Sequence, residues 1–356
     1  ERLDGAASSD RVLLHVPGRI EVLGKHTDYA GGRSLVCAVE TGFAVVAAPR
    51  QDRSVRLIDV GRGDEALLAL GDDVPAAAPH WAIYPAAVLR RLSRDFEGPL
   101  KGADIAFSSD LPPSSGLSSS SALLIATFEA LSAVNELDAR PEVRAALPNA
   151  LERAAYLGSV ESGRPFRSFA GEAGVGTRGG AQDHTAILVS ETGRLTQVGY
   201  APPRVEGRVT LPADQVFVVA VSGVSAQKTQ GARGAYNQAA DRAARLLALW
   251  RERSGRSDGS LFEALASSPD NLDRLRDSIA SERSIDEGER AALAARLTQF
   301  HEETFVLIPA AFAALAAGDL GAFGDAVLRS QRGAEHGLAN QVEETIALAD
   351  LAREAG

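Results

Sequence analysis

The spacing of hydrophobic and polar positions predicts a strand-rich first half and a helical last third. Runs rich in Val, Leu and Ala that end at Pro or Gly, or that alternate with polar residues, are typical of β-strands. Such runs cover residues 11–17, 34–49, 53–60 and 101–111. Two further strands, flanking a polar hairpin, are predicted at residues 184–190 and 215–222.

Helical spacing begins at residues 80–95, where Pro85 has to lie at or near the start of the first turn. Residues 119–135 place apolar side chains at i, i+3, i+4 and i+7 and open with hydroxyl residues that can cap a helix. A helix at 148–162 follows, and nearly everything beyond Ser225 is predicted to be helical. Because strands give way to Ala- and Leu-rich helices near 190–210, we expect two domains, at residues 1–200 and 201–356.

Composition narrows the possible partners. The 356-residue chain carries a formal net charge of -10 without any basic run, which argues against nucleic acid and membrane surfaces and favours a small molecule. We expect no apolar run near the ~20 residues that cross a bilayer. The single cysteine, Cys37, cannot form an internal disulfide, and the first residues lack the layout of a signal peptide. A cytoplasmic location is therefore predicted.

The strongest chemical signal is DLPPSSGLSSSSALLIA at residues 110–126. It joins a strand to a helix start through a glycine and four consecutive serines, and a helix start offers unpaired N–H groups to an anion. Gly116 allows the backbone to approach a phosphate closely, while the serines add hydroxyl donors and a possible Mg²⁺ ligand. The alternative is a serine-rich loop with a simple helix cap.

A second polar stretch, HVPGRIEVLGKHTDYAGG, covers residues 15–32. It is not a Walker-type loop, because five residues separate Gly18 from Gly24 and His26 follows the lysine. It presents Arg19, Lys25, His26 and Asp28, a mixture of donors and one acceptor that suits a polyhydroxylated ligand. Solvated turn charges are the alternative.

Four segments in the same order resemble a known family. PGRIEVLGKHTDYAGG resembles the galactokinase signature, and PPSSGLSSSSA resembles the phosphate loop of the GHMP kinases. HWAIY at 80–84 is similar to the aromatic pair near the adenine, and GGAQDHTA at 179–186 is similar to the segment with the catalytic aspartate. The resemblance implies an α+β GHMP kinase fold, with an N-terminal ribosomal-protein-S5-domain-2-like domain and a C-terminal ferredoxin-like, helix-rich domain.

The resemblance also implies roles for single residues. Asp183 would take or orient the proton of the sugar C1 hydroxyl, and Arg19 would hold it ionised beside the transferring phosphoryl group. Sugar contacts are implied for Lys25, His26, Asp28, Gly179, Gly180 and Tyr236. ATP contacts are implied for Trp81, Tyr84, Gly116, Leu117, Ser118, Ser119, Ser120 and Ser121. Mg²⁺ ligands are implied at Ser120 and Glu161. For Glu161, Tyr236 and the aromatic pair, ordinary surface or core positions are the alternatives.

Three departures from the family pattern bear on the substrate and the domains. Lys25 stands where the family has glutamate, and it is one of only three lysines in the chain. An ammonium group would suit an anionic sugar such as a uronate. Residues 164–178, an insertion rich in Gly and Arg, form either a lid or a surface excursion. The family has a Gly-rich loop late in its sequence, and no such loop is found in this sequence. We therefore expect the last hairpin of the C-terminal domain to be missing.

The sequence therefore predicts an ATP- and Mg²⁺-dependent sugar 1-kinase of galactose metabolism, acting on galactose or a related sugar as a monomer or weak dimer. Two alternatives stay open. One is a GHMP kinase for a uronate or a heptose phosphate, and the other is a non-catalytic sugar or nucleotide sensor.

Overall fold

The computed structural model describes residues 10–112, 115–222, 224 and 230–355. The chain forms two compact units, the first made of Glu1–Ile20 and Ala38–Val189 and the second of Glu21–Cys37 and Ser190–Gly356. The sequence placed one boundary at residue 200. The structure divides the chain at Val189 instead and assigns residues 21–37 to the second unit, because the first two strands each run through both units.

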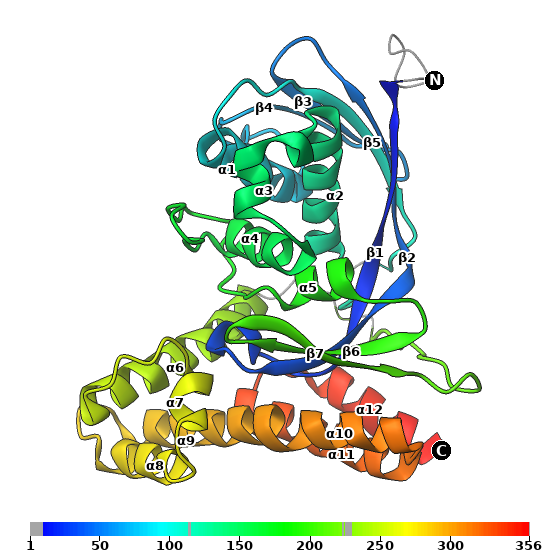
Figure 1. Ribbon diagram of the computed structural model, residues 1–356. Coiled ribbons are helices and arrows are strands. Elements are labelled where there is room, and N and C mark those ends of the chain that lie inside the picture. The colour runs from blue at the N-terminus through cyan, green and yellow to red at the C-terminus, as the bar shows by residue number, and fades with distance from the viewer. Residues whose placement is uncertain (1–9, 113–114, 223, 225–229, 356) are drawn as a thin grey trace. The chain divides into compact units, whose positions relative to one another are not determined.

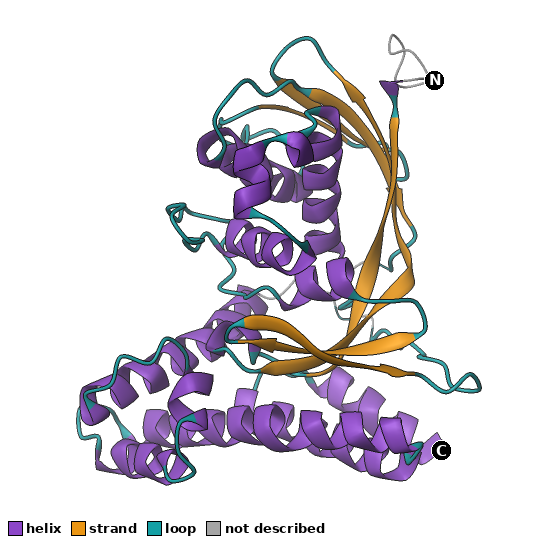
Figure 2. Ribbon diagram, viewed as in Figure 1, coloured by secondary structure: helices purple, strands orange, loops and turns teal. Residues whose placement is uncertain are grey.

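The first unit is a sheet covered on one face by helices. Its strands follow the order β4-β3-β5-β2, with β1 beside β2. They are β1 (Val12–Leu23), β2 (Arg33–Pro49), β3 (Ser54–Asp59), β4 (Glu65–Ala69) and β5 (Ala103–Ser109). Figure 2 shows the helices of this unit on one side of these strands. They are α1 (Ile83–Asp95), α2 (Ser119–Val134), α3 (Pro141–Ala146), α4 (Ala150–Ser162) and α5 (Gln182–Val189).

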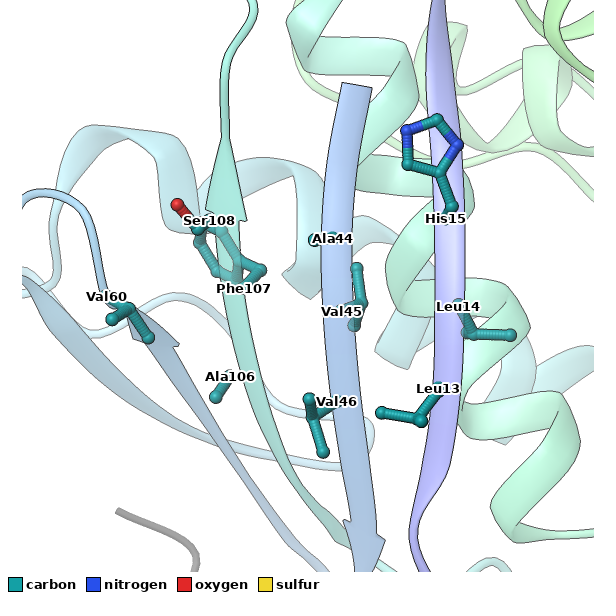
Figure 3. A pocket seen from close by; sticks show the side chains of 10 residues that line it. All are labelled: Leu13, Leu14, His15, Ala44, Val45, Val46, Val60, Ala106, Phe107 and Ser108. Carbon is teal, nitrogen blue, oxygen red and sulfur yellow. The ribbon is translucent and has the colours of Figure 1, made fainter. Parts of the chain in front are cut away.

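The other face of this sheet carries an open apolar hollow of about 600 Å³. Figure 3 shows its lining, which comes from β1, β2, β5 and the residue after β3. Leu13 is 76% exposed and Val60 is 50% exposed. The core of the unit therefore lies between the sheet and the helices.

The second unit combines a short antiparallel ladder with helices. Residues 33–36 of β2 pair with β6, and β6 pairs with β7. Its elements (Figure 1) are β6 (Arg194–Tyr200), β7 (Pro203–Thr210), α6 (Gln230–Ser254), α7 (Leu261–Ala266), α8 (Asn271–Ser281), α9 (Glu287–His301), α10 (Ile308–Ala317), α11 (Leu320–Gly333) and α12 (Glu343–Ala355). Two π-helical turns, Glu302–Leu307 and Ala334–Leu338, follow α9 and α11.

The continuous helical stretch Glu287–Ala317 is long and apolar enough, by length and composition, to cross a membrane. The prediction that the chain has no apolar run of this length is therefore wrong. However, 44% of its most apolar window is buried inside the unit, and Leu293, Leu297 and Phe300 belong to the core. A core helix satisfies the same length and composition test.

Two predicted strands are wrong. Residues 184–190 mostly form helix α5, since a short apolar run that is buried nearly all round cannot be told from a strand by its spacing. Residues 215–222 form no strand, and Val216 and Val218 are 81% and 85% exposed. The helices predicted at 80–95, 119–135 and 148–162 are confirmed as α1, α2 and α4 to within a turn, and Pro85 lies in the first turn of α1.

Candidate active site

The best-defined polar cluster of the first unit is centred on Asp183, in the first turn of α5. Arg19, on β1, donates to Asp183 Oδ1 from Nε at 2.8 Å and from Nη2 at 2.6 Å. The Arg19 side chain is 12% exposed and that of Asp183 is 31% exposed. Arg19 Nη1 also donates to the carbonyl oxygen of Gly116 at 2.5 Å. One guanidinium therefore joins the predicted catalytic carboxylate to the predicted phosphate loop.

Ser118 holds the other oxygen of the carboxylate. Its hydroxyl donates to Asp183 Oδ2 at 2.5 Å. The backbone of Ser118 is left-handed, with φ 59°, and its side chain does not cap α2, although the sequence predicted a hydroxyl cap. A non-glycine residue is rarely found in this region, and such strain concentrates at functional sites. The strained turn points the hydroxyl at Asp183 instead of at the helix N–H groups.

Two opposing effects set the protonation of Asp183. Burial of the carboxyl group raises its pKa, but the Arg19 charge and the hydrogen bonds from Ser118 and Arg19 outweigh burial and leave the pKa below its ordinary value. The start of α5 adds the positive end of a short helix dipole. Asp183 is therefore ionised at neutral pH and is a weak base.

A second carboxylate lies next to this cluster. Ser121 donates to Glu161 Oε2 at 2.9 Å and to Asp183 Oδ2 at 3.4 Å. His184 Nε2 lies 3.1 Å from the same Glu161 oxygen, without hydrogen-bond geometry, and the His184 side chain is 2% exposed. The sequence assigned Ser120 beside Glu161, but the hydroxyl that the structure brings to Glu161 belongs to Ser121.

These oxygens are chemically suitable ligands for Mg²⁺. Magnesium usually takes one or two protein carboxylates and completes its shell with phosphate oxygens and water. The hydroxyl of Ser121 and the carboxylates of Glu161 and Asp183 fit that preference. No group of three or more His, Cys, Asp or Glu side chains converges among the described residues. The set therefore fits an ion that arrives with a nucleotide, not one held by the protein alone.

The predicted adenine pair lies elsewhere in the first unit. Trp81 and Tyr84 are partly buried and pack against the core, and the Trp81 ring meets Phe107 edge-on at 5.4 Å. Within the described part of the chain, the buried Trp81 Nε1 has no hydrogen-bond partner. A nucleotide contact for this pair stays a prediction, as it does for Leu117, Ser119 and Ser120.

Gly18 keeps β1 close to the phosphate loop. A Cβ atom at this position would lie 2.6 Å from Leu111 Cδ2 and 2.8 Å from the carbonyl oxygen of Leu117. The neighbouring N–H of Arg19 donates to that same oxygen at 3.2 Å. In the sequence, Gly18 serves only to exclude a Walker loop. Its packing role is not visible there, because its neighbours Leu111 and Leu117 are distant in the sequence.

We expect Gly18→Ala to destabilise the protein by about 1–3 kcal/mol, because the added methyl group must displace loop backbone. The midpoint of urea unfolding measures this change. Gly324→Ala is the matched control, since a Cβ there meets nothing within 4 Å and the residue lies inside α11. Equal midpoints for Gly18→Ala and the wild type would contradict the packing role.

The second unit carries three of the predicted sugar residues, Lys25, His26 and Asp28, on the turn after β1. Lys25 Nζ donates to Gln331 Oε1 at 3.0 Å, and Gln331 Nε2 donates to Glu335 Oε1 at 2.9 Å. The ammonium group that suggested an anionic sugar is therefore already hydrogen-bonded to α11. Asp28 lies in the short 3₁₀ turn Asp28–Ala30.

His26 is surrounded by polar and aromatic groups of the same unit. Its Nδ1 lies 3.1 Å from the Tyr29 hydroxyl, and its Nε2 lies 2.8 Å from Asn340 Nδ2. The ring of Tyr236, on α6, lies 4.7 Å from the His26 ring. The structure thus brings together two residues that the sequence assigned separately to the sugar.

Residues 163–178 belong to the first unit and pack against its helix α4. Phe166 is buried and stacks on Phe169, and both rings contact Tyr156 of α4. The backbone groups of Phe166 and Phe169 bond each other at 2.8 and 3.0 Å. Of the two predicted alternatives, these contacts favour a surface excursion. Gly179 and Gly180 follow it, in the loop before α5, and their sugar contacts stay predictions.

Parts of the chain match known protein families, and the whole chain resembles solved structures. The family model for the GHMP kinases N terminal domain matches residues 83–165, and that for the galactokinase galactose-binding signature matches residues 5–49. The crystal structure of Lactococcus lactis galactokinase complexed with galactose is similar, with a TM-score of 0.73 and 22% identity, over 98% of this chain and 80% of that chain. Residues 83–165 thus match the GHMP kinase N-terminal domain, and the chain as a whole has the GHMP kinase fold of that galactokinase structure.

Curated proteins similar to part of this chain include galactokinases. The galactokinase of Chloroflexus aggregans is 40% identical over 129 residues, which are 35% of this chain and 33% of the relative. That of Glaesserella parasuis is 36% identical over 121 residues, or 34% of this chain and 31% of the relative. The match therefore spans about a third of the length of these relatives.

Proposed function

We propose that the protein is an ATP-dependent galactose 1-kinase. The observation that carries the proposal is the Asp183 carboxylate, which Arg19 and Ser118 hold ionised beside the glycine–serine loop at the start of α2. The galactose-binding signature over residues 5–49 and the galactokinase relatives support the choice of sugar.

In the proposed reaction the C1 hydroxyl oxygen of galactose forms a bond to the γ-phosphorus of ATP. The bond from that phosphorus to the β–γ bridging oxygen breaks, ADP leaves, and the hydroxyl proton passes to Asp183 or to solvent. Asp183 is a weak base, so its main contribution is to orient the hydroxyl through a hydrogen bond. Arg19 places positive charge beside the carboxylate and toward the transferring group.

The phosphate loop would bind the nucleotide by backbone geometry. Gly116 has φ 76°, a conformation that glycine adopts without strain, and the N–H groups at the start of α2 face away from the helix body. Mg²⁺ bound with ATP would neutralise phosphate charge, and Ser121 and Glu161 would hold it. His26, Asp28 and Tyr236 would recognise the sugar hydroxyls.

We expect kcat/KM for galactose to exceed that for galacturonate by about 100-fold or more, because Lys25 is hydrogen-bonded to Gln331 and the neighbouring acid Glu335 would repel a C6 carboxylate. ADP release measured with galactose, galacturonate and a heptose phosphate tests this, and ³¹P NMR identifies the 1-phosphate product. Preference for an anionic sugar would overturn the substrate. ATP binding without any turnover would favour a sensor.

A further inference from the structure

The turn after β1, residues 24–28, carries three of the predicted sugar contacts and is called the sugar turn below. One helical stretch binds the backbone atoms of its first three residues. Glu303 Oε1 accepts from the N–H of Gly24 at 2.7 Å, Gln299 Nε2 donates to the carbonyl oxygen of Lys25 at 3.1 Å, and Arg296 Nη2 donates to the carbonyl oxygen of His26. Arg296 and Gln299 lie on α9, and Glu303 lies on the π-helical turn that continues it. Their spacing of three and four residues puts all three on one helix face.

The turn has a shape that needs such support. Gly24 has φ 111°, and His26 has φ 60°, in the left-handed region that a side chain disfavours. The His26 ring is one predicted sugar contact, and it lies against the ring of another, Tyr236. A relaxed backbone at His26 would move its ring away from Tyr236. Strain of this kind persists only where surrounding contacts hold it.

The three side chains are buried at a cost in desolvation. Arg296 is 0% exposed, Gln299 4% and Glu303 1%. Among the described residues Arg296 makes no ion pair; it donates to the Ala239 carbonyl oxygen and to Gln299, and its guanidinium lies over the rings of Tyr29 and Phe300 at 6.0 and 5.8 Å. Burial raises the pKa of Glu303, and the Gly24 N–H, Ser330 and the charges of Lys25 and Arg296 counteract it only in part. Apolar side chains would fill this volume at lower cost.

We propose that Arg296, Gln299 and Glu303 form a clasp that positions the sugar turn for substrate binding. The clasp residues touch the turn and are not expected to touch the reacting atoms. The expected change in KM depends on the proposed function. The effect on the backbone of the turn can be measured whether or not the protein is active.

The test compares Arg296→Lys with Arg290→Lys in the full chain. Arg290 lies on the same helix and also donates to backbone carbonyl oxygens, those of Glu282 and Ile285, outside the sugar turn. Lysine cannot reproduce the several N–H directions of Arg296. We expect Arg296→Lys to raise KM for galactose about 10-fold or more, while KM for ATP and kcat change less than about threefold. Arg290→Lys should change none of them.

Hydrogen–deuterium exchange of peptides that cover residues 21–33 gives the second readout. We expect about 10-fold faster exchange in Arg296→Lys and no change in Arg290→Lys. Gln299→Met, which keeps the volume but removes the donor to Lys25, should reproduce both effects and serves if the lysine variant does not fold. Unchanged exchange, or a lower kcat with unaltered KM values, would overturn the clasp. If the wild type did not phosphorylate galactose, the proposed function would fail, and exchange would still decide the clasp.

Discussion

We expect Asp183→Asn to lower kcat for galactose by about 1,000-fold or more and to leave MgATP affinity equal or higher. Asparagine has the shape of aspartate but carries no charge. The asparagine amide has one accepting oxygen and one NH₂ group. It therefore cannot accept hydrogen bonds from both Arg19 and Ser118 as the two carboxylate oxygens of Asp183 do. The sugar hydroxyl loses its acceptor, and the Arg19 charge loses its partner. Initial rates with saturating galactose give kcat, and nucleotide titration gives the affinity.

The matched control is Asp138→Asn. Asp138 also accepts from an arginine of the first unit, Arg153, at 2.5 Å, but its side chain is 63% exposed. We expect kcat to stay within about twofold of the wild type, since an exposed ion pair contributes little. An Asp183→Asn enzyme within tenfold of the wild type would remove Asp183 from the proposed reaction.

The local parts of this site could be predicted from the sequence. A strand, a glycine, four serines and an apolar helix follow one another within residues 103–134, and their chemistry follows from the N–H groups that a helix start offers to an anion. Resemblance paired Arg19 with Asp183, and the structure has that pair. Spacing within the segment did not reveal that the Ser118 hydroxyl turns from the helix to Asp183, because the bond spans 65 residues.

The distant parts could not be predicted. The clasp bonds join residues that lie 270 to 279 positions apart in the sequence. No local pattern distinguishes Arg296 or Glu303 from the other charged residues of this helical stretch. Residues 184–190 were assigned to a strand because burial on nearly all sides removes the helical period. Lys25 suggests an anionic sugar because it stands where the family has glutamate, and the sequence could not show its bond to Gln331, which lies 306 residues away.

We expect Arg19→Met to lower kcat/KM by about 100- to 1,000-fold and to make the remaining activity dependent on pH. In the wild type the pKa of Asp183 lies below its ordinary value of 3.8, so the carboxylate stays ionised and its titration leaves activity unchanged between pH 5 and 8. Burial is the largest single effect on this carboxyl group, and without the guanidinium the remaining effects oppose it less, so the pKa of Asp183 rises. Activity should then fall as pH decreases through that raised pKa. Arg19→Lys keeps a positive charge beside the carboxylate and should lose rate without this acid limb. Profiles of kcat/KM from pH 5 to 8 compare the three enzymes, and a flat profile for Arg19→Met would show that Arg19 does not control the ionisation of Asp183.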